Sequence, residues 1–281
     1  MKTVSLNPGQ SPELSFSIKT DHLTAFSKIS ETFDFVEVIG DNWLSPGPHH
    51  QKLEKIRESC DVLMHFVGMN IGSSSKLDKN YLNKIKGLIS KYEPLHVSDH
   101  LAVQQIEGIY SHDLLPLPFN ESTLRDVISK VNMTKDFLNL DVPLLLENLS
   151  YYVTYERSTM TEAEFLTALT GAADTYILLD LNNLFVNEHN LGQASSDFLD
   201  SIPLDRVKEI HIAGPEKCED LFVDTHATLP TKKVISDLSQ VIKRTGPMPV
   251  IYEKDGGEVA FENIMDDLDY IYSEISCLNR D

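Results

Sequence analysis

Histidines and carboxylates recur in this chain at or just after the ends of short apolar segments. Imidazole and carboxylate groups bind zinc, manganese or iron, and a ligand set without thiolates does not choose among these metals. One ion uses three or four protein ligands, whereas about nine such groups would suit two or three ions bridged by carboxylates. The polar residues at these positions are His65, Asp99, His100, Glu147, Asn148, Asp180, Asn182, Asn183, His211, Asp224, His226, Glu253 and Asp255.

Each of these short motifs has an ordinary structural interpretation when it is taken alone. A single histidine at a strand end is more often a hydrogen-bonded structural residue than a ligand. ENLS at 147–150 and DLNN at 180–183 could be a turn and a loop start, and DTH at 224–226 a helix cap. The joint pattern is more informative, because buried imidazoles and carboxylates that converge lose hydration and repel one another unless a cation lies between them.

The stretch HVSDHLA, from His96 to Ala102, contains three candidate ligands that strand geometry can separate. In an extended strand His96, Ser98 and His100 point to one face, and Asp99 points to the other. We expect His100, at the strand end, to be the ligand and Asp99 to support it. His96 lies earlier in the strand, where a packed and hydrogen-bonded core histidine is expected.

Short apolar segments alternate with amphipathic ones, and the strands expected from them would position the polar groups. Several of the apolar segments are nearly continuous hydrophobic runs, typical of parallel strands buried on both faces. Helical periodicity appears between them, and Thr161 with Glu164 is typical of a capping box. The expected strands are 14–18, 35–39, 61–66, 94–98, 143–148, 175–180, 209–214 and 249–253, and the clearest helices are 77–92, 121–140, 160–172, 231–245 and 261–275.

Eight strands that alternate with helices predict an α/β fold, a (β/α)8 TIM barrel forming a single domain over residues 1–281. The strand ends of such a barrel converge on one mouth, with long loops expected at 41–50, 102–120 and 214–230. A doubly wound open sheet is the alternative, but no GxGxxG or P-loop motif is present for its phosphate site. The loop histidines expected on the substrate side or in solvent are His49, His50, His112 and His189.

The composition limits the classes of function. A formal net charge of −19 disfavours a nucleic-acid binder, and it suits a basic protein or peptide partner, although solubility explains it equally well. Three distant cysteines form no disulfide framework or CxxC zinc motif, which fits a reducing cytoplasm. The N-terminal segment does not resemble a signal peptide and no apolar run is long enough to span a bilayer, so we expect a cytoplasmic protein without membrane contact.

Seven motifs that follow one another along nearly the whole chain resemble a known family. They are HFVGMNIGS, VSDHLA, LLPLPF, LLLENLSYYV, LLDLNNLFVNEHNLG, EIHIAG and DTHA. Together they are similar to the multinuclear non-haem iron-dependent oxidative enzymes, which are related to the xylose-isomerase-like barrels and to endonuclease IV. The resemblance therefore implies a xylose-isomerase-like TIM barrel with a multinuclear metal centre at its mouth.

The resemblance also implies roles for individual residues. Asn183 replaces the histidine of the endonuclease pattern, and its neutral amide oxygen would hold one metal more loosely. Many members have Glu in place of Asp99 and Trp in place of Lys254, which leaves the ligands unchanged. Asp255, Asp99 and His189 are expected to orient ligands or transfer protons. The implied metal ligands are His65, His100, Glu147 as the bridging carboxylate, Asp180, Asn183, His211, Asp224, His226 and Glu253.

The activity implied by the resemblance is the oxidation of cysteine residues in a ribosomally made precursor peptide. It would use O2 and two or three iron ions in mixed Fe(II)/Fe(III) states, with a small leader-binding, MbnC-like partner in a heterodimer. The compact length and acidic surface favour the methanobactin subtype, which forms oxazolone and thioamide groups, over excision of the cysteine β-carbon. A zinc- or manganese-dependent isomerase or hydrolase and a non-catalytic metal-binding scaffold remain alternatives, whereas the acidic charge disfavours an abasic-site endonuclease.

Overall fold

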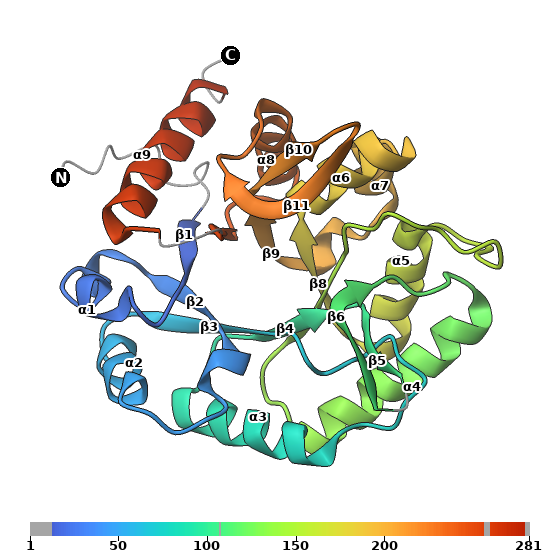
Figure 1. The fold of residues 1–281 in the computed structure, drawn as a ribbon, viewed down its shortest axis with the longest axis horizontal. Helices are drawn as coiled ribbons and strands as arrows, with labels where there is room; N and C mark the ends of the chain where they lie inside the picture. Colours follow the sequence, from blue (N-terminus) through green and yellow to red (C-terminus); the bar gives the residue numbers. More distant parts are fainter. Residues whose placement is uncertain (1–12, 107, 256–258, 279–281) are drawn as a thin grey trace.

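The computed structural model describes residues 13–106, 108–255 and 259–278. Within these ranges eight parallel strands close into a barrel, and helices surround it on the outside (Figure 1). The order around the barrel is β1-β12-β9-β8-β7-β4-β3-β2. The strands are β1 Glu13–Ile18, β2 Phe35–Ile39, β3 Asp61–Phe66, β4 Val97–His100, β7 Leu144–Glu147, β8 Tyr176–Asp180, β9 Val207–Ile212 and β12 Pro249–Tyr252.

Helices connect the successive strands, and several of them begin at polar caps. The side chains of Asp78, Asn120 and Thr231 accept hydrogen bonds from first-turn amides, and Thr161 and Glu164 form the predicted capping box. None of the helices in the described ranges is long and apolar enough to cross a membrane. They are α1 Leu23–Phe26, α2 His49–Arg57, α3 Lys79–Tyr92, α4 Glu121–Leu138, α5 Glu162–Ala173, α6 Leu181–Leu191, α7 Ser195–Ser201, α8 Lys232–Thr245 and α9 Phe261–Leu278, with 3₁₀ turns η1 Ser30–Thr32, η2 Gly40–Trp43 and η3 Leu204–Arg206.

The predicted TIM barrel is confirmed, and the two faces of its strands differ in chemistry. One set of alternate residues, such as Val36 and Val38, joins the large apolar core. The other set has a small apolar cluster of Phe35, Leu63 and Ile251, each two positions before a polar residue on the same strand and face. The barrel interior therefore changes from apolar to polar toward the carboxyl ends of the strands.

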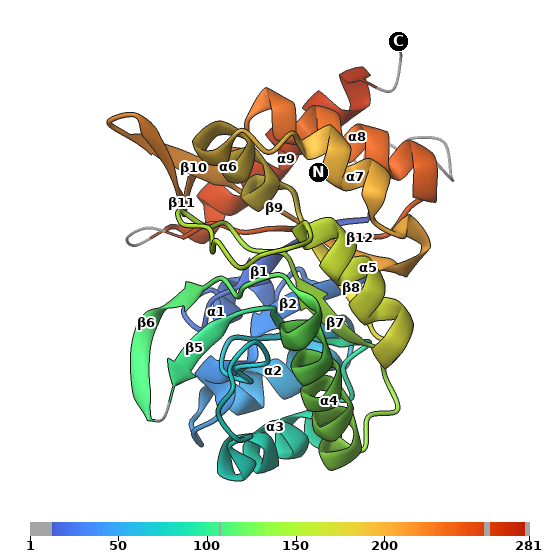
Figure 2. The ribbon, with the colours of Figure 1, turned by 90° about the vertical axis from the view of Figure 1, so that its right-hand side faces the viewer.

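Two of the long loops expected after strand ends, 102–120 and 214–230, contain β-hairpins, which the sequence pattern did not predict. β5 (Val103–Ile106) pairs antiparallel with β6 (Ile109–Leu115), and β10 (Gly214–Cys218) pairs with β11 (Leu221–Thr228). This pairing satisfies backbone hydrogen bonds between the two strands of each hairpin. Figure 2 shows both hairpins on the same side of the barrel, where they extend its mouth.

Candidate metal centre

Strand register brings most of the predicted ligands together at the mouth of the barrel. His100 on β4 lies opposite Glu147 on β7, and Asp180 on β8 lies opposite His211 on β9. Three overlapping groups have one nitrogen or oxygen atom per residue within 4.8 Å of the others. The groups are His65–His100–Glu147, Glu147–Asp180–His211 and Asp180–His226–Glu253. Because the groups share Glu147 and Asp180, the arrangement resembles several adjacent metal positions joined by carboxylates.

The first group consists of two buried imidazoles that face one carboxylate. Oε2 of Glu147 lies 3.4 Å from Nε2 of His65 and 3.3 Å from Nε2 of His100. The Nδ1 atom of His65 is 2.9 Å from the hydroxyl of Ser98 on the neighbouring strand, which fixes the orientation of the ring. Burial lowers the pKa of His65 well below its usual range and that of His100 to about 4. Both rings are therefore neutral, the state in which an imidazole binds a metal.

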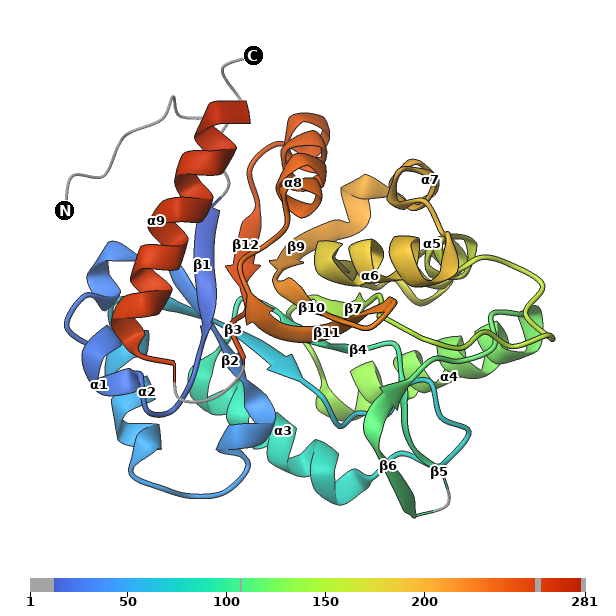
Figure 3. The ribbon, with the colours of Figure 1, turned by 45° about the horizontal axis from the view of Figure 1, so that its top comes forward.

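The opposite end of the cluster includes residues from α6 and β11. One oxygen of Asp180 accepts a hydrogen bond from the amide of Asn183, 2.6 Å away, and so caps α6. The hairpin strand β11 places Nε2 of His226 2.8 Å from Asp224 and Nδ1 3.6 Å from Glu253. Figure 3 shows this hairpin beside the ends of β9 and β12. The hairpin therefore closes one side of the mouth with the Asp224/His226 pair.

Buried atoms without hydrogen bonds show that these residues fit a group of metal ions. An unsatisfied buried polar atom costs about 1–3 kcal/mol, and a bound cation would satisfy several at once. Burial also raises the pKa of Glu147 well above its usual range and that of Asp180 to about 7, although the attraction of His211 opposes the rise in both. The buried atoms without a hydrogen bond are Nδ1 of His100, Oδ2 of Asp180 and Oδ1 of Asn183, together with three that have only ion-pair contacts inside the cluster, Nδ1 of His211, Nε2 of His226 and Oε2 of Glu147.

Comparison with known proteins identifies the family. A family model described as RiPP precursor modification enzyme MbnB/TglH/ChrH matches residues 14–275. The chain belongs to this family. A UPF0276 protein of Acaryochloris marina is 36% identical over 88% of this chain and 89% of its own length. Another, from Rhizobium meliloti, is 38% identical over 85% of this chain and 79% of its own.

Solved structures show the same fold at low sequence identity. Endonuclease IV from Thermus thermophilus matches with a TM-score of 0.64 and 16% identity, over 94% of this chain and 99% of that one. A putative xylose isomerase from Rhodospirillum rubrum matches with a TM-score of 0.63 and 10% identity, over 95% and 99% of the two chains. The MbnB/TglH/ChrH-family chain is therefore a xylose-isomerase-like TIM barrel.

A second polar layer, which the sequence argument missed, lies directly behind the cluster. Nε2 of His211 is 3.0 Å from Oε2 of Glu37, and its Nδ1 is 3.1 Å from Glu253. Glu209 accepts a 2.7 Å hydrogen bond from His96. Glu37, Glu209 and His211 are fully buried and form a fourth close group. In the sequence, Glu37 and Glu209 can be recognised as carboxylates within the apolar segments FVEVI and EIHIAG, rather than at the ends of those segments.

The alternation of faces expected in HVSDHLA is confirmed, whereas His100 as a metal ligand stays a prediction. His96 is buried and bonded to Glu209, Ser98 contacts His65, and His100 faces Glu147, so all three share the inner face of the barrel. Asp99 points the other way and accepts hydrogen bonds from the amides of Met69 (2.8 Å) and His100 (2.7 Å). Asp99 therefore fixes the backbone at the end of β4 and the loop after β3.

The other residues expected to support the centre differ in their placement. Asp255 lies at the rim, 3.6 Å from Nδ1 of His226 and 2.9 Å from Lys19. His189 packs against Phe185 and Phe222, and the close groups found among the described residues do not include it. The reason is that α6 begins immediately after β8, so His189 lies more than two helical turns from the strand end. The side chain of His112 lies outside the described residues.

Proposed function

We propose that this chain catalyses the iron- and O2-dependent oxidation of cysteine residues in a ribosomally made precursor peptide. The supporting observation is the row of overlapping histidine and carboxylate groups at the mouth of a barrel that belongs to a family of peptide-modifying enzymes. Its nitrogen and oxygen donors suit iron, and the shared carboxylates suit two or three ions. We assign the metal ligands to His65, His100, Glu147, Asp180, Asn183, His211, Asp224, His226 and Glu253.

An opening beside the cluster would admit the peptide. A cavity of about 640 Å³ is lined by polar residues that include Lys19, Asn42, His49 and Asp255, and it reaches Glu253 of the cluster. Its mixed charge offers hydrogen bonds to a peptide backbone, and its size admits more than one side chain. A cysteine in this opening would place its thiol next to the proposed ligand Glu253.

The chain's own residues would position the reacting groups and control protons. Bound iron would supply a Lewis acid that lowers the pKa of the substrate thiol and a centre for electron transfer to O2. Ser98 and Glu37 hold the rings of His65 and His211 with one nitrogen toward the cluster. Asp255, at the rim and next to His226, is placed to accept a proton from the substrate side.

None of the chain's cysteines is placed to take part. Cys60 is buried just before β3, at the end of the barrel opposite to the mouth. Cys218 lies in an exposed position on the β10–β11 hairpin, and Cys277 lies in α9. The oxidised thiol is therefore assigned to the substrate.

The finer assignments are part of the same proposal. We assign the methanobactin-type product, with oxazolone and thioamide groups, a cytoplasmic location, and a heterodimer with a small MbnC-like leader-binding protein. Ile106, Ile109 and Tyr110 on the β5–β6 hairpin are 50%, 77% and 59% exposed, an apolar patch of the kind found at protein interfaces. The β5–β6 hairpin lies on the side of the mouth (Figure 2), which supports a partner that would present the peptide there.

Metal analysis and O2 consumption test the proposal. Protein purified without O2 is expected to contain two or three iron ions per chain and, after partial oxidation, an EPR signal from a mixed-valent cluster. It should consume O2 when a cysteine-containing precursor peptide and the partner are added, and a peptide with serine in place of cysteine should not support this consumption. H65A and E147A are expected to lose metal, whereas H189A, outside the cluster, should retain it.

Two outcomes would contradict the proposal in different ways. A protein that contains only zinc or manganese and consumes no O2 with the cysteine peptide would favour an isomerase or hydrolase on the same barrel. Full metal content in both H65A and E147A would instead overturn the assignment of the centre. A peptide product that lacks only the cysteine β-carbon would replace the methanobactin-type assignment by the excision chemistry.

A further inference from the structure

A second cavity lies outside the barrel, away from the metal centre. It has a volume of about 360 Å³ and lies between the loop 151–160, the start of α5 and the segment 192–201, which includes α7. Aromatic side chains form much of its wall, among them Phe119, Tyr151, Tyr155 and Phe198. The size is within the range of cavities that bind small molecules or single side chains.

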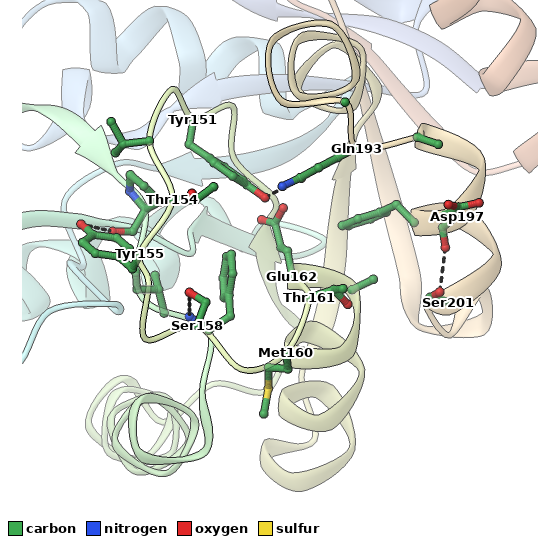
Figure 4. A pocket seen from close by; sticks show the side chains of 18 residues that line it. Tyr151, Thr154, Tyr155, Ser158, Met160, Thr161, Glu162, Gln193, Asp197 and Ser201 are labelled. Carbon is green, nitrogen blue, oxygen red and sulfur yellow. Dashed lines mark hydrogen bonds between the residues drawn. The ribbon is translucent and has the colours of Figure 1, made fainter.

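One buried carboxylate faces this cavity without a cation. Glu162 is 6% exposed, and Figure 4 shows its carboxylate directed toward the Tyr151 hydroxyl and Gln193. One of its oxygens accepts a 3.2 Å hydrogen bond from the amide of Leu149. The lining contains no lysine, arginine or histidine, and no ion pair involving Glu162 occurs within the ranges that the structure describes. Burial raises the pKa of Glu162 to about 8, as expected for an uncompensated carboxylate.

The remaining polar groups of the wall favour a cation over an anion. The capping box of Thr161 and Glu164 already satisfies amides at the start of α5, which would otherwise attract an anion. The hydroxyl of Tyr151 bonds the Gln193 side chain at 2.7 Å, and that of Tyr155 donates to the Pro116 carbonyl at 3.2 Å. The cavity therefore presents aromatic rings, the buried carboxylate of Glu162 and the exposed carboxylate of Asp197, but no cation, a combination that binds ammonium groups.

We propose that this cavity binds a primary alkylammonium group on a short aliphatic stem, with Glu162 as its counter-ion. The aromatic walls bury the stem, and the carboxylate pairs with the ammonium group at the inner end. A lysine side chain of a peptide and a free alkylamine share this chemistry. The site is independent of the proposed oxidation, because none of its lining residues belongs to the metal cluster.

The cavity and the metal centre are nevertheless joined by one short segment after β7. Glu147 belongs to the centre, the amide of Leu149 donates to Glu162, and the hydroxyl of Ser150 donates to Asp224 at 3.2 Å. A ligand that fixes Glu162 would therefore also restrain the backbone next to Glu147. A ligand bound in the cavity would therefore act on the metal centre through the segment 147–150.

Binding measured by calorimetry or NMR on the full chain tests the proposal. The probes are Nα-acetyl-lysine methylamide, n-butylammonium chloride, and the uncharged norleucine analogue of the first. At least one ammonium probe is expected to bind saturably and the norleucine analogue to bind much more weakly. E162Q should weaken the ammonium probe roughly tenfold to hundredfold, because it removes a charge-assisted pair. Tighter binding of the lysine derivative would assign a peptide source, and tighter binding of butylammonium a free amine.

Matched variants separate this result from a general loss of structure. E164Q removes a carboxylate from the same helical turn outside the cavity and is expected to bind as the wild type does. T154K places an ammonium group on the exposed rim of the cavity and should compete with the probes. Saturable binding by neither ammonium probe, or equal binding by wild type and E162Q, overturns the proposal. Because these assays use no metal or peptide substrate, their failure leaves the proposed oxidation untouched.

Discussion

Replacement of Glu37 by glutamine is expected to stabilise the metal-free barrel and to weaken metal binding. Glu37 is fully buried, and its Oε2 lies 3.0 Å from Nε2 of His211. Burial raises its pKa from 4.5 to about 7, and the neighbouring Glu209 and Glu253 add to the rise, although the attraction of His211 opposes it. A difference of about 2.5 pKa units corresponds to about 3 kcal/mol.

The sign of the stability effect follows from where the proton is held. The folded protein keeps the Glu37 proton up to about pH 7, whereas the unfolded chain releases it near pH 4.5. The wild type therefore loses stability as the pH rises from 4.5 to 7, and the penalty is complete above pH 7. E37Q has no such group. Its free energy of unfolding should match the wild type near pH 4.5 and exceed it by about 3 kcal/mol at pH 8.

Urea unfolding of chelator-treated protein between pH 5 and 8 measures this difference. E31Q, which changes an exposed glutamate, is expected to follow the wild-type pH dependence. Metal affinity, measured by competition with a chelator, should fall roughly tenfold to hundredfold in E37Q, because the partner that orients His211 loses its charge. If E37Q were less stable than the wild type at pH 8, or if the difference did not change with pH, the assignment of Glu37 as a strained buried carboxylate would be wrong.

Three further substitutions test other parts of the structure. S98A removes the hydroxyl that holds His65 and should lower metal affinity about tenfold with little loss of stability, as measured by chelator competition and thermal melting. K130M leaves carbonyls in the loop 70–75 without their donor and should destabilise the protein by about 2–4 kcal/mol in urea unfolding. D255N should retain its metal but lower the rate of O2 consumption at least about tenfold, and an unchanged rate would exclude Asp255 from proton transfer.

The face on which each polar residue of a barrel strand lies was predictable, because side chains alternate between the two faces of a strand with a period of two. This period separated His96, Ser98 and His100 from Asp99 before any contact was known. The same period places Glu37 on the same face as Phe35, so it also predicts that Glu37 points into the barrel. Glu37 and Glu209 differ from the predicted ligands in lying inside their strands rather than at the strand ends.

Other features depend on contacts between distant segments, which local patterns do not show. The β10–β11 hairpin contains partly exposed polar residues on both faces, so its strands have no clear alternation. Glu162 is another case, since an acidic residue in the first turn of a helix normally faces solvent. Its burial results from the loop 151–160, which packs over α5. His189 lies farther from the centre than its sequence position suggests, because α6 begins at Leu181 and carries His189 away from the end of β8.

E37Q is expected to raise stability and to lower metal affinity because buried carboxylates have opposite effects on the metal-free and metal-bound barrel. Burying Glu37, Glu147 and Asp180 near one another raises the pKa of each, so the metal-free barrel holds them at an energetic disadvantage. An apolar interior, like the cluster of Phe35, Leu63 and Ile251, would avoid that disadvantage. Bound cations would remove the same repulsion and satisfy the unpartnered atoms, so each carboxylate that destabilises the empty barrel strengthens metal binding. Stability without metal and affinity for metal should therefore change in opposite directions when Glu37, Glu147 or Asp180 is replaced by its neutral amide.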